Sequence, residues 1–331
     1  MNELEVSHGM PMTNAEPPMR GLDISRAYFD EYGMPMLQQQ FPELLPHIAV
    51  GLFGSGSECF GFDDEVSRDH DFGPGFLIML PGDNVVSREQ EFALERAYAA
   101  LPKEFAGTSR PSMAPVGGSR RGVMRMGEFF EEKAGSADGV LTVGQWLQVP
   151  SHALAEAVNG WVFYDGSGEL TRIRANLAHY PEGIRRKKLA GHLLLAAQAG
   201  QYNYLRCIRH GEMGAAQLAV IAFTQSAMEV IFLLNDVYQP FYKWRFRAMR
   251  ALPKLALLAE LFEYLITTDN TDRLAQDKYE VIESIAADLI DELSKQGLTK
   301  ANCADLEKHA YSVNDSIADG NLRNMHILIG V

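Results

Sequence analysis

Residues 47–57 read HIAVGLFGSGS, in which a short apolar run leads directly into a Gly/Ser turn. An apolar run of this length that ends at turn residues indicates a buried β-strand. Glycine allows the backbone N–H groups of a turn to approach an anion closely, and serine hydroxyls supply further donors. We therefore expect Gly54, Ser55, Gly56 and Ser57 to bind the phosphates of a nucleotide.

A pair of acidic residues follows this turn after an eleven-residue loop. Residues 69–71 read DHD, and the apolar stretch after them predicts a second strand from Asp71 to Leu80, with Pro74 at an edge or a bulge. Alternate residues of a strand point to one face, so both carboxylates would project together and His70 would point away. Carboxylates are the ligands that Mg²⁺ prefers, which makes Asp69 and Asp71 the expected metal ligands and catalytic acids.

The order of these features distinguishes a site from two unrelated loops. A Gly/Ser tetrapeptide alone is usually a turn, whereas strand, Gly/Ser turn, acidic pair and strand in succession are typical of nucleotide and metal binding. Gly54-Ser55 and the segment 67–72, SRDHDF, resemble the signature of the DNA polymerase beta-like nucleotidyltransferase superfamily. The resemblance implies a five-stranded mixed sheet flanked by helices, two-metal Mg²⁺ chemistry and a nucleoside triphosphate, ATP or another, as donor.

A weaker resemblance extends from about Asp23 to the end of the chain. Residues 160–181, GWVFYDGSGELTRIRANLAHYP, and 242–244, YKW, resemble a bacterial branch that is catalogued as a domain of unknown function. The layout is similar to that of the kanamycin-type aminoglycoside nucleotidyltransferases, in which a helical-domain lysine reaches a phosphate. By that analogy Lys243 binds the nucleotide. A lysine lying along an aromatic core face is the equally weighted alternative.

The superfamily resemblance also implies a third carboxylate on the strand after the first long helix. The expected strand, residues 122–126, reads GVMRM and contains no acid. Glu128 lies just beyond it, and Asp165 ends the next expected strand, residues 160–164. Either can serve as the third catalytic acid, although Asp165 also suits a turn. If neither does, the protein binds nucleotide without transferring it.

The remaining pattern predicts an α+β fold, in which a small mixed-sheet nucleotidyltransferase domain is followed by an all-α helical domain. We expect a flexible leader over 1–20, the nucleotidyltransferase-like domain over 21–180 and the α-helical domain over 181–331. A capping box predicts a helix that begins at Ser87, and Gly33 with Pro35 predicts a helix break within 22–40. Further helices are expected at 184–199, 213–237, 241–267, 273–296 and 305–318.

The net charge, the cysteine pattern and the apolar segments bear on the class and location of the protein. A formal net charge of −13 does not favour extended nucleic-acid binding, which needs a broad basic surface. The 3 cysteines show no paired spacing, and the N-terminus has no secretory signal, so a cytoplasmic protein is expected. The apolar segment 213–234 is interrupted by polar residues, which favours a helix buried in protein over a membrane span.

The leading hypothesis is an enzyme that transfers a nucleoside monophosphate to a hydroxyl of a small molecule or a protein. A nucleotide-binding regulatory or interaction protein on the same scaffold is the alternative, and a homodimer with a shared cleft would suit the architecture. Arg172 and Arg174 are expected to pair with site acids or to form helix-surface ion pairs. Arg121 is part of a basic turn. Two interpretations apply to it: contact with a phosphate, or exposure to solvent.

Overall fold

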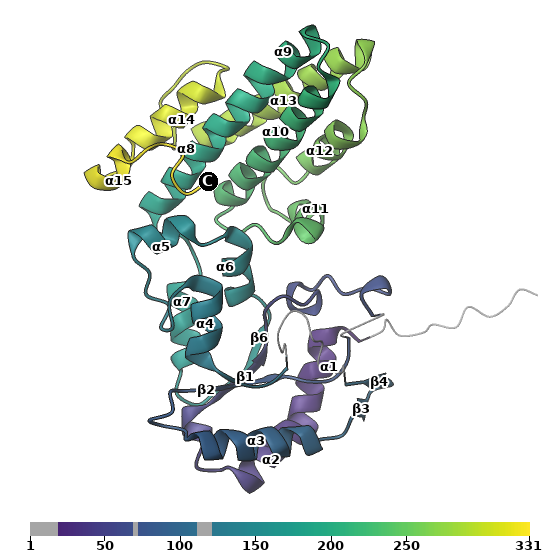
Figure 1. Cartoon of the computed structure of the whole chain (residues 1–331), viewed down its shortest axis with the longest axis vertical. Helices are drawn as coiled ribbons and strands as arrows, with labels where there is room; N and C mark the ends of the chain where they lie inside the picture. The colour runs from purple at the N-terminus through teal and green to yellow at the C-terminus, as the bar shows by residue number, and fades with distance from the viewer. Residues whose placement is uncertain (1–18, 69–71, 111–120) are drawn as a thin grey trace, which may run out of the picture.

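The computed structural model describes residues 19–68, 72–110 and 121–331. A half built around a β-sheet and a half built from helices lie end to end (Figure 1). The expected α+β fold is thereby confirmed. The boundary expected at residue 180 stays a prediction, because one hydrophobic cluster extends from the sheet residues Ala49 and Met79 to Leu322 near the C-terminus.

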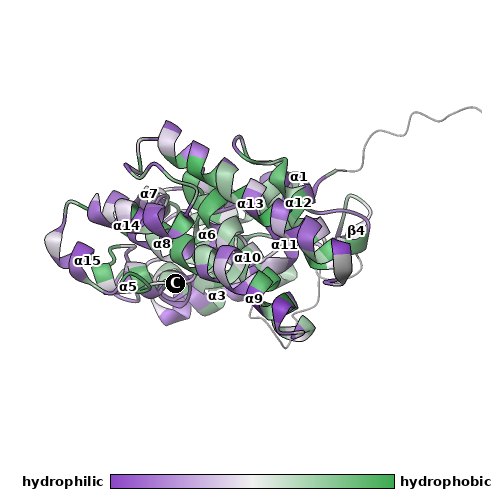
Figure 2. Cartoon of the chain, turned by 90° about the horizontal axis from the view of Figure 1, so that it is seen from above, coloured by the Kyte–Doolittle hydropathy of each residue, from purple (hydrophilic) through white to green (hydrophobic). Residues whose placement is uncertain are grey.

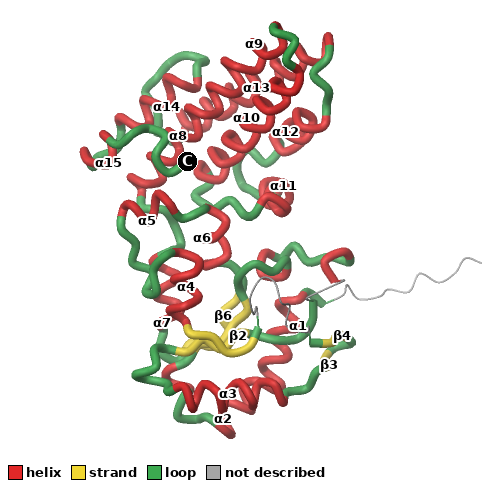
Figure 3. Tube along the Cα trace, viewed as in Figure 1, coloured by secondary structure: helices red, strands yellow, loops and turns green. Residues whose placement is uncertain are grey.

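The described residues form a mixed sheet of four strands, where the superfamily resemblance implied five. The strands are β1 (Ala49–Leu52), β2 (Leu77–Leu80), β5 (Gly122–Arg125) and β6 (Trp161–Asp165). They lie in the order β5-β2-β1-β6. Figure 3 shows the strands in yellow, with helices around them. Strand β1 is antiparallel to both neighbours, whereas β2 and β5 are parallel. All residues of β1 and β2 are buried, as continuous apolar runs covered on both faces should be.

Strand β2 is shorter than the sequence predicted, because it begins at Leu77 and not at Asp71. The preceding segment contains Gly73 and Gly75, with φ of 148° and 151°, a conformation that side chains other than glycine rarely adopt. The Arg121 side chain fills the space beside Gly75, at 2.4 Å from where a Cβ would lie. The residues before β2 are therefore a close-packed loop.

One face of the sheet is covered by helices from the N-terminal part of the chain. They are α1 (Gly21–Tyr28), a π-helical turn (Phe29–Gly33), α2 (Met34–Gln40) and α3 (Arg88–Ala100). The expected break near Pro35 is absent within this described segment, because proline at the start of α2 needs no N–H partner and the π turn joins the helices. The capping box of Ser87 and Gln90 is confirmed at the start of α3.

Shorter helices follow the strands on the other face. They are α4 (Met126–Ala134), α5 (Val143–Gln148), α6 (Ser151–Val158) and α7 (Glu169–Asn176). The strand expected to include Met126 ends at Arg125, and Met126 begins α4 with its side chain in the core. Three-residue 3₁₀ turns occupy Leu45–His47, Glu58–Phe60 and Val66–Arg68, and a small ribbon pairs β3 (Glu104–Phe105) with β4 (Thr108–Ser109).

The C-terminal half consists of helices, as expected. Its elements are α8 (Glu182–Ala196), a π-helical turn (Ala197–Asn203), α9 (Tyr204–Arg209), α10 (Met213–Leu234), α11 (Tyr242–Arg250), α12 (Leu258–Thr267), α13 (Asp272–Lys295), α14 (Leu306–Asp315) and α15 (Gly320–Asn324). The single helix expected over 241–267 is in fact two, because Pro253 cannot continue α11.

Helix α10 is the core of this half. In the described part of the chain it is the one helix that is long and apolar enough to cross a membrane, but 72% of its most apolar window is buried by other parts of the protein. Burial by protein explains its composition, as the sequence suggested. Figure 2 shows hydrophobic residues along α6 in the middle of the molecule and hydrophilic ones on α15 at one end.

The two halves are joined by buried tyrosines. The Tyr238 hydroxyl donates to the Leu177 carbonyl at 2.7 Å, which links the segment after α10 to the end of α7. The ring of Tyr238 packs edge-on against Tyr180, with 4.8 Å between centroids. Burial raises the pKa of Tyr238, so its hydroxyl stays protonated and donates throughout the physiological range.

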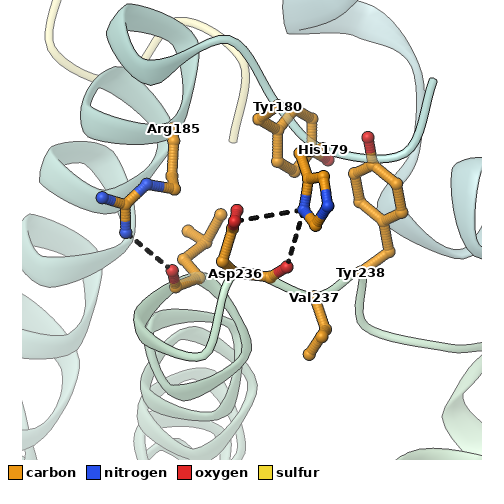
Figure 4. A pocket seen from close by; sticks show the side chains of 7 residues that line it. His179, Tyr180, Arg185, Asp236, Val237 and Tyr238 are labelled. Carbon is orange, nitrogen blue, oxygen red and sulfur yellow. Dashed lines mark hydrogen bonds and ion pairs between the residues drawn. The ribbon is translucent and has the colours of Figure 1, made fainter. Parts of the chain in front are cut away.

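Polar contacts beside these tyrosines reinforce the junction (Figure 4). His179 lies 3.1 Å from the Asp236 carboxylate, and Arg185 of α8 donates to the Leu233 carbonyl at 3.1 Å. The residues fill the space between them, which has no volume for a water molecule. This depression is therefore a packed joint between α8 and α10, and it is no ligand site.

Replacing Tyr238 by Phe should lower the free energy of unfolding by about 1–2 kcal/mol, because the buried Leu177 carbonyl loses its donor. Tyr242→Phe is the matched control, since the Tyr242 side chain is 68% exposed and should change stability little. Urea denaturation of both variants measures the difference. Equal stability of the two variants would contradict this role of Tyr238.

Candidate functional site

The Gly/Ser turn leaves β1 and is held in place by an asparagine from a distant part of the chain. The Gly54 N–H donates to Asn159 Oδ1 at 2.8 Å, and Asn159 Nδ2 donates to the Gly54 carbonyl at 2.7 Å. Gly54 has φ of 111°, which a side chain would disfavour. A single amide therefore satisfies both backbone groups of the residue that turns the chain out of the sheet.

Asn159 is in turn fixed by Arg174 of α7. The guanidinium donates to the carbonyls of Val158 and Asn159 at 2.5 and 2.6 Å and lies over the Phe53 ring at 5.3 Å. Burial lowers the pKa of Arg174. Arg174 is thus a buried support of the turn. Arg172, by contrast, makes the expected surface pair, at 3.8 Å from Glu169.

The residues after the turn bring a buried carboxylate to the site that the sequence analysis did not identify. Ser55 and Ser57 are half-buried, and Ser57 does not cap the 3₁₀ turn that follows it. Glu58 in that turn is 4% exposed and packs against Gly56. Its Oε1 lies 3.2 Å from Arg121, which also donates to the Gly73 carbonyl at 3.1 Å. Arg121 is thus buried in an ion pair and is not solvated.

A cavity of about 220 Å³ lies beside the 3₁₀ turn Glu58–Phe60, directly after the Gly/Ser turn in the chain. It is lined by Arg20, Asp23, Glu58, Asp63 and Trp161, with apolar residues between them. The Trp161 side chain is 47% exposed, and Trp161 pairs with Leu52 at the end of β1. Asp63 Oδ2 accepts from Gly21 N at 2.9 Å, while Asp63 Oδ1 is buried without a described partner. The cavity is thus lined by the Trp161 ring, while Asp63 Oδ1 itself is out of contact with solvent.

The structure does not bring Glu128 or Asp165 to the Gly/Ser turn. Asp165 pairs with Ala49, at the start of β1, whereas the turn follows the end of β1. Glu128 follows β5, whose last residue pairs with Leu80 at that same distant edge. Both candidates for the third acid therefore lie at the sheet edge opposite the turn.

Each of these acids has a local role. Asp165 Oδ2 accepts from the backbone N–H of Thr171 at 2.8 Å and from its hydroxyl at 2.7 Å, which fixes the start of α7. Glu128 is on the first turn of α4, 69% exposed and 3.8 Å from Arg88. The turn role considered for Asp165 matches its contacts.

Asp69 and Asp71 lie outside the described residues. The flanking residue Phe72 lies close to Gly21, which also contacts Glu58. Since β2 begins at the sheet edge where β1 ends, the chain enters β2 from the side of the Gly/Ser turn. Residues 72–76 thus lead into the sheet at the edge where the turn lies.

Three of the described carboxylates near the turn are already engaged, which bears on the fit of Mg²⁺. Glu58 pairs with Arg121, Asp63 accepts from Gly21 N, and Asp64 pairs with Arg247 at 2.9 Å. Within the described ranges, no group of three or more His, Cys, Asp or Glu side chains is arranged to hold a metal. A magnesium site here therefore depends on Asp69 and Asp71.

Lys243 lies on the exposed side of α11, with Nζ 5.0 Å from the Trp244 ring centroid. The Trp244 ring is 5.9 Å from that of Phe62, in the loop after the Gly/Ser turn. Lys243 is therefore on the helix that faces this loop. Its amine lies over an aromatic ring, as the snorkelling interpretation expected, and contact with a phosphate stays a prediction.

Comparison with known proteins identifies one family. Residues 146–245 match the family described as Domain of unknown function (DUF4037). No curated protein matches the chain. The matched segment contains Asn159, Trp161, Arg174 and Lys243 but not the Gly/Ser turn, so the match covers the residues that support the turn from outside.

Replacing Asn159 by Ala should loosen the turn, because both backbone groups of Gly54 lose their partner. We expect the free energy of unfolding to fall by about 1–3 kcal/mol and amide exchange at Gly54 to accelerate. Asn176→Ala, at an exposed position of α7, is the control. Unchanged exchange at Gly54, measured by hydrogen–deuterium exchange, would show that Asn159 does not hold the turn.

Proposed function

We propose that the protein is a Mg²⁺-dependent nucleotidyltransferase that moves a nucleoside monophosphate from a nucleoside triphosphate to a hydroxyl group. The observation that carries this proposal is the rigidly held turn Gly54–Ser57 at the end of a buried central strand, next to a cavity. A fixed turn of glycine and serine presents N–H and hydroxyl donors that need no reorganisation when phosphate binds. The acidic pair Asp69 and Asp71 follows in the chain.

The proposed roles follow from donor and acceptor chemistry. Ser55, Ser57 and the backbone N–H groups of residues 55–57 bind the β- and γ-phosphates, Gly54 turns the chain toward them, and Asp69 and Asp71 hold Mg²⁺. The metal, when bound, neutralises charge on the phosphate oxygens. The acceptor oxygen forms a bond to the α-phosphorus and loses its proton, while the bond from the α-phosphorus to the bridging oxygen breaks and pyrophosphate leaves.

The cavity beside the turn supplies the proposed space for a ring of the nucleotide or of the acceptor. At about 220 Å³ it is smaller than the roughly 300–1,000 Å³ typical of drug-sized ligands, so it suits a single ring system. The exposed Trp161 side chain, which lines the cavity, provides stacking.

The ion pair that Glu58 forms with Arg121 favours a second function. Glu58 is the deeply buried carboxylate on the turn side, but it is bound by Arg121 and is not free to accept a proton from an attacking hydroxyl. Neither residue expected as the third catalytic acid, Glu128 or Asp165, lies at the described site. A regulatory or interaction protein that binds nucleotide without transferring it fits that arrangement.

Incubation with each labelled nucleoside triphosphate, Mg²⁺ and a panel of hydroxyl acceptors should release pyrophosphate. Asp69→Asn/Asp71→Asn should lower the rate at least a hundredfold, because the carboxylates that hold the metal lose their charge. Glu128→Gln is the matched control and should retain activity, since Glu128 lies at the opposite sheet edge. Pyrophosphate release that survives the double substitution would refute the assignment.

Calorimetry separates the two proposed functions. Binding of a nucleoside triphosphate without pyrophosphate release across the acceptor panel supports the regulatory protein. Intact mass measurement adds a third outcome, because a gain of one nucleoside monophosphate would identify the chain itself as acceptor. Absence of both binding and turnover would reject both functions.

Trp161→Ala should raise the dissociation constant of the ring-bearing ligand about five- to a hundredfold, the loss expected for one stacking contact. Trp161→Phe should restore part of the affinity, because a ring face remains. Leu257→Ala is the control, as this side chain is 88% exposed and in the helical half. Equal affinity of the Trp161→Ala variant and the unmodified chain would exclude the cavity as a ring site.

A further inference from the structure

Helix α11 of the helical half contacts the loop that follows the Gly/Ser turn in the chain. Arg247 Nη1 donates to the Phe62 carbonyl at 2.6 Å and to Asp64 Oδ2 at 2.9 Å. Its guanidinium carbon lies 5.3 Å from the centre of the Phe62 ring. One side chain thus contacts the backbone, the ring and the carboxylate of a three-residue segment.

Aromatic packing runs parallel to this polar contact. The Phe60 and Phe62 rings are stacked, with 5.9 Å between centroids and 14° between planes. The Phe62 ring is in turn 5.9 Å from Trp244 of α11. These rings connect the 3₁₀ turn that contains Glu58 to the helical half.

Asp64 connects Arg247 to a residue further along the loop. Its Oδ1 accepts from the Ser67 N–H at 3.0 Å, and its own N–H donates to Ser67 Oγ at 2.7 Å. The hydrogen bond from the Ser67 backbone lowers the pKa of Asp64, and Arg247 lowers it further. The two oxygens of one carboxylate therefore join Ser67, which lies two residues before Asp69, to α11.

Helix α11 is itself anchored from the inside of the protein. Arg245 interacts electrostatically with Glu229 of α10, which is 8% exposed. Burial raises the pKa of Glu229, and the positive charges of Arg245 and Lys188 oppose this effect. Opposite charges that are partly removed from water attract each other more strongly than in water, which favours the position of α11 against α10.

We propose that Arg247 is a positioning residue that sets the loop of residues 60–67 relative to the Gly/Ser turn. The inference rests on the proposed nucleotidyltransferase or nucleotide-binding function for its consequence, although the contact itself does not. Because Arg247 reaches from the helical half to the loop, movement of α11 changes how well the loop is ordered. This makes the helical half a determinant of nucleotide binding without contacting the nucleotide.

The chain offers a matched control on the same helix. Arg250 pairs with Glu260 at 3.0 Å and with Glu263, both on α12, and not with the loop. Both arginines have similar exposure, 44% for Arg247 and 43% for Arg250. Substituting either removes one partly exposed arginine from α11, but only Arg247→Ala releases the loop.

The first measurement is hydrogen–deuterium exchange over residues 57–67 in the free protein. Arg247→Ala should accelerate exchange in this segment, Arg247→Lys should restore part of the protection, and Arg250→Ala should leave it unchanged. Lysine keeps the charge but loses the planar guanidinium that lies over the Phe62 ring while Nη1 donates to two acceptors. Exchange that is equal in Arg247→Ala and Arg250→Ala overturns the proposal, whether or not the protein has transferase activity.

The second measurement is the Mg²⁺-dependent binding or turnover of the nucleoside triphosphate. Arg247→Ala should raise the KM or dissociation constant about three- to tenfold, the range for a partly exposed charged hydrogen bond, with a smaller change in kcat. Loss of loop protection with unchanged nucleotide affinity would overturn the positioning role. If the unmodified protein neither binds nor turns over any nucleotide, the proposed function fails, while the exchange result still decides whether Arg247 orders the loop.

Discussion

The site depends on the paired hydrogen bonds between Asn159 and Gly54. A residue that turns the chain out of a buried strand exposes backbone groups that the sheet no longer satisfies, and these need partners. Here one amide meets both groups, at 2.8 and 2.7 Å. Arg174, which donates to the Asn159 carbonyl, carries that constraint into α7. The turn is therefore held by residues about a hundred positions further along the chain, and it is rigid before any ligand arrives.

The same logic applies to the connection between the halves. Tyr238 binds the end of α7, and Arg247 binds the loop after the turn, so the helical half contacts both the support and the continuation of the site. One hydrophobic cluster contains residues of both the sheet and the helices, so the two halves share a packed core. The family match over residues 146–245 covers this supporting framework. The proposed chemistry depends on the turn and the acidic pair, which lie outside the matched segment.

Local features of the fold could be predicted from the sequence, because their causes are local. The Ser87 capping box and the buried strand before Gly54 depend on neighbouring residues alone. Glu128 and Asp165 could not be placed, because the edge that each occupies depends on strand order and direction, which involve pairing over long sequence distances. Glu58 gave no signal in the sequence, since its burial depends on Arg121, 63 positions away. The roles of the acidic pair come from motif and resemblance, and they stay predictions.

A crystal structure of the protein with a non-hydrolysable nucleoside triphosphate and Mg²⁺ tests the central claim most directly. We expect phosphate oxygens against the backbone N–H groups and hydroxyls of Ser55–Ser57, with the metal bound by Asp69 and Asp71. The ring of the nucleotide should lie in the cavity at Trp161, unless the acceptor occupies that cavity instead. A triphosphate bound elsewhere, with the Gly/Ser turn free of phosphate, would contradict the account.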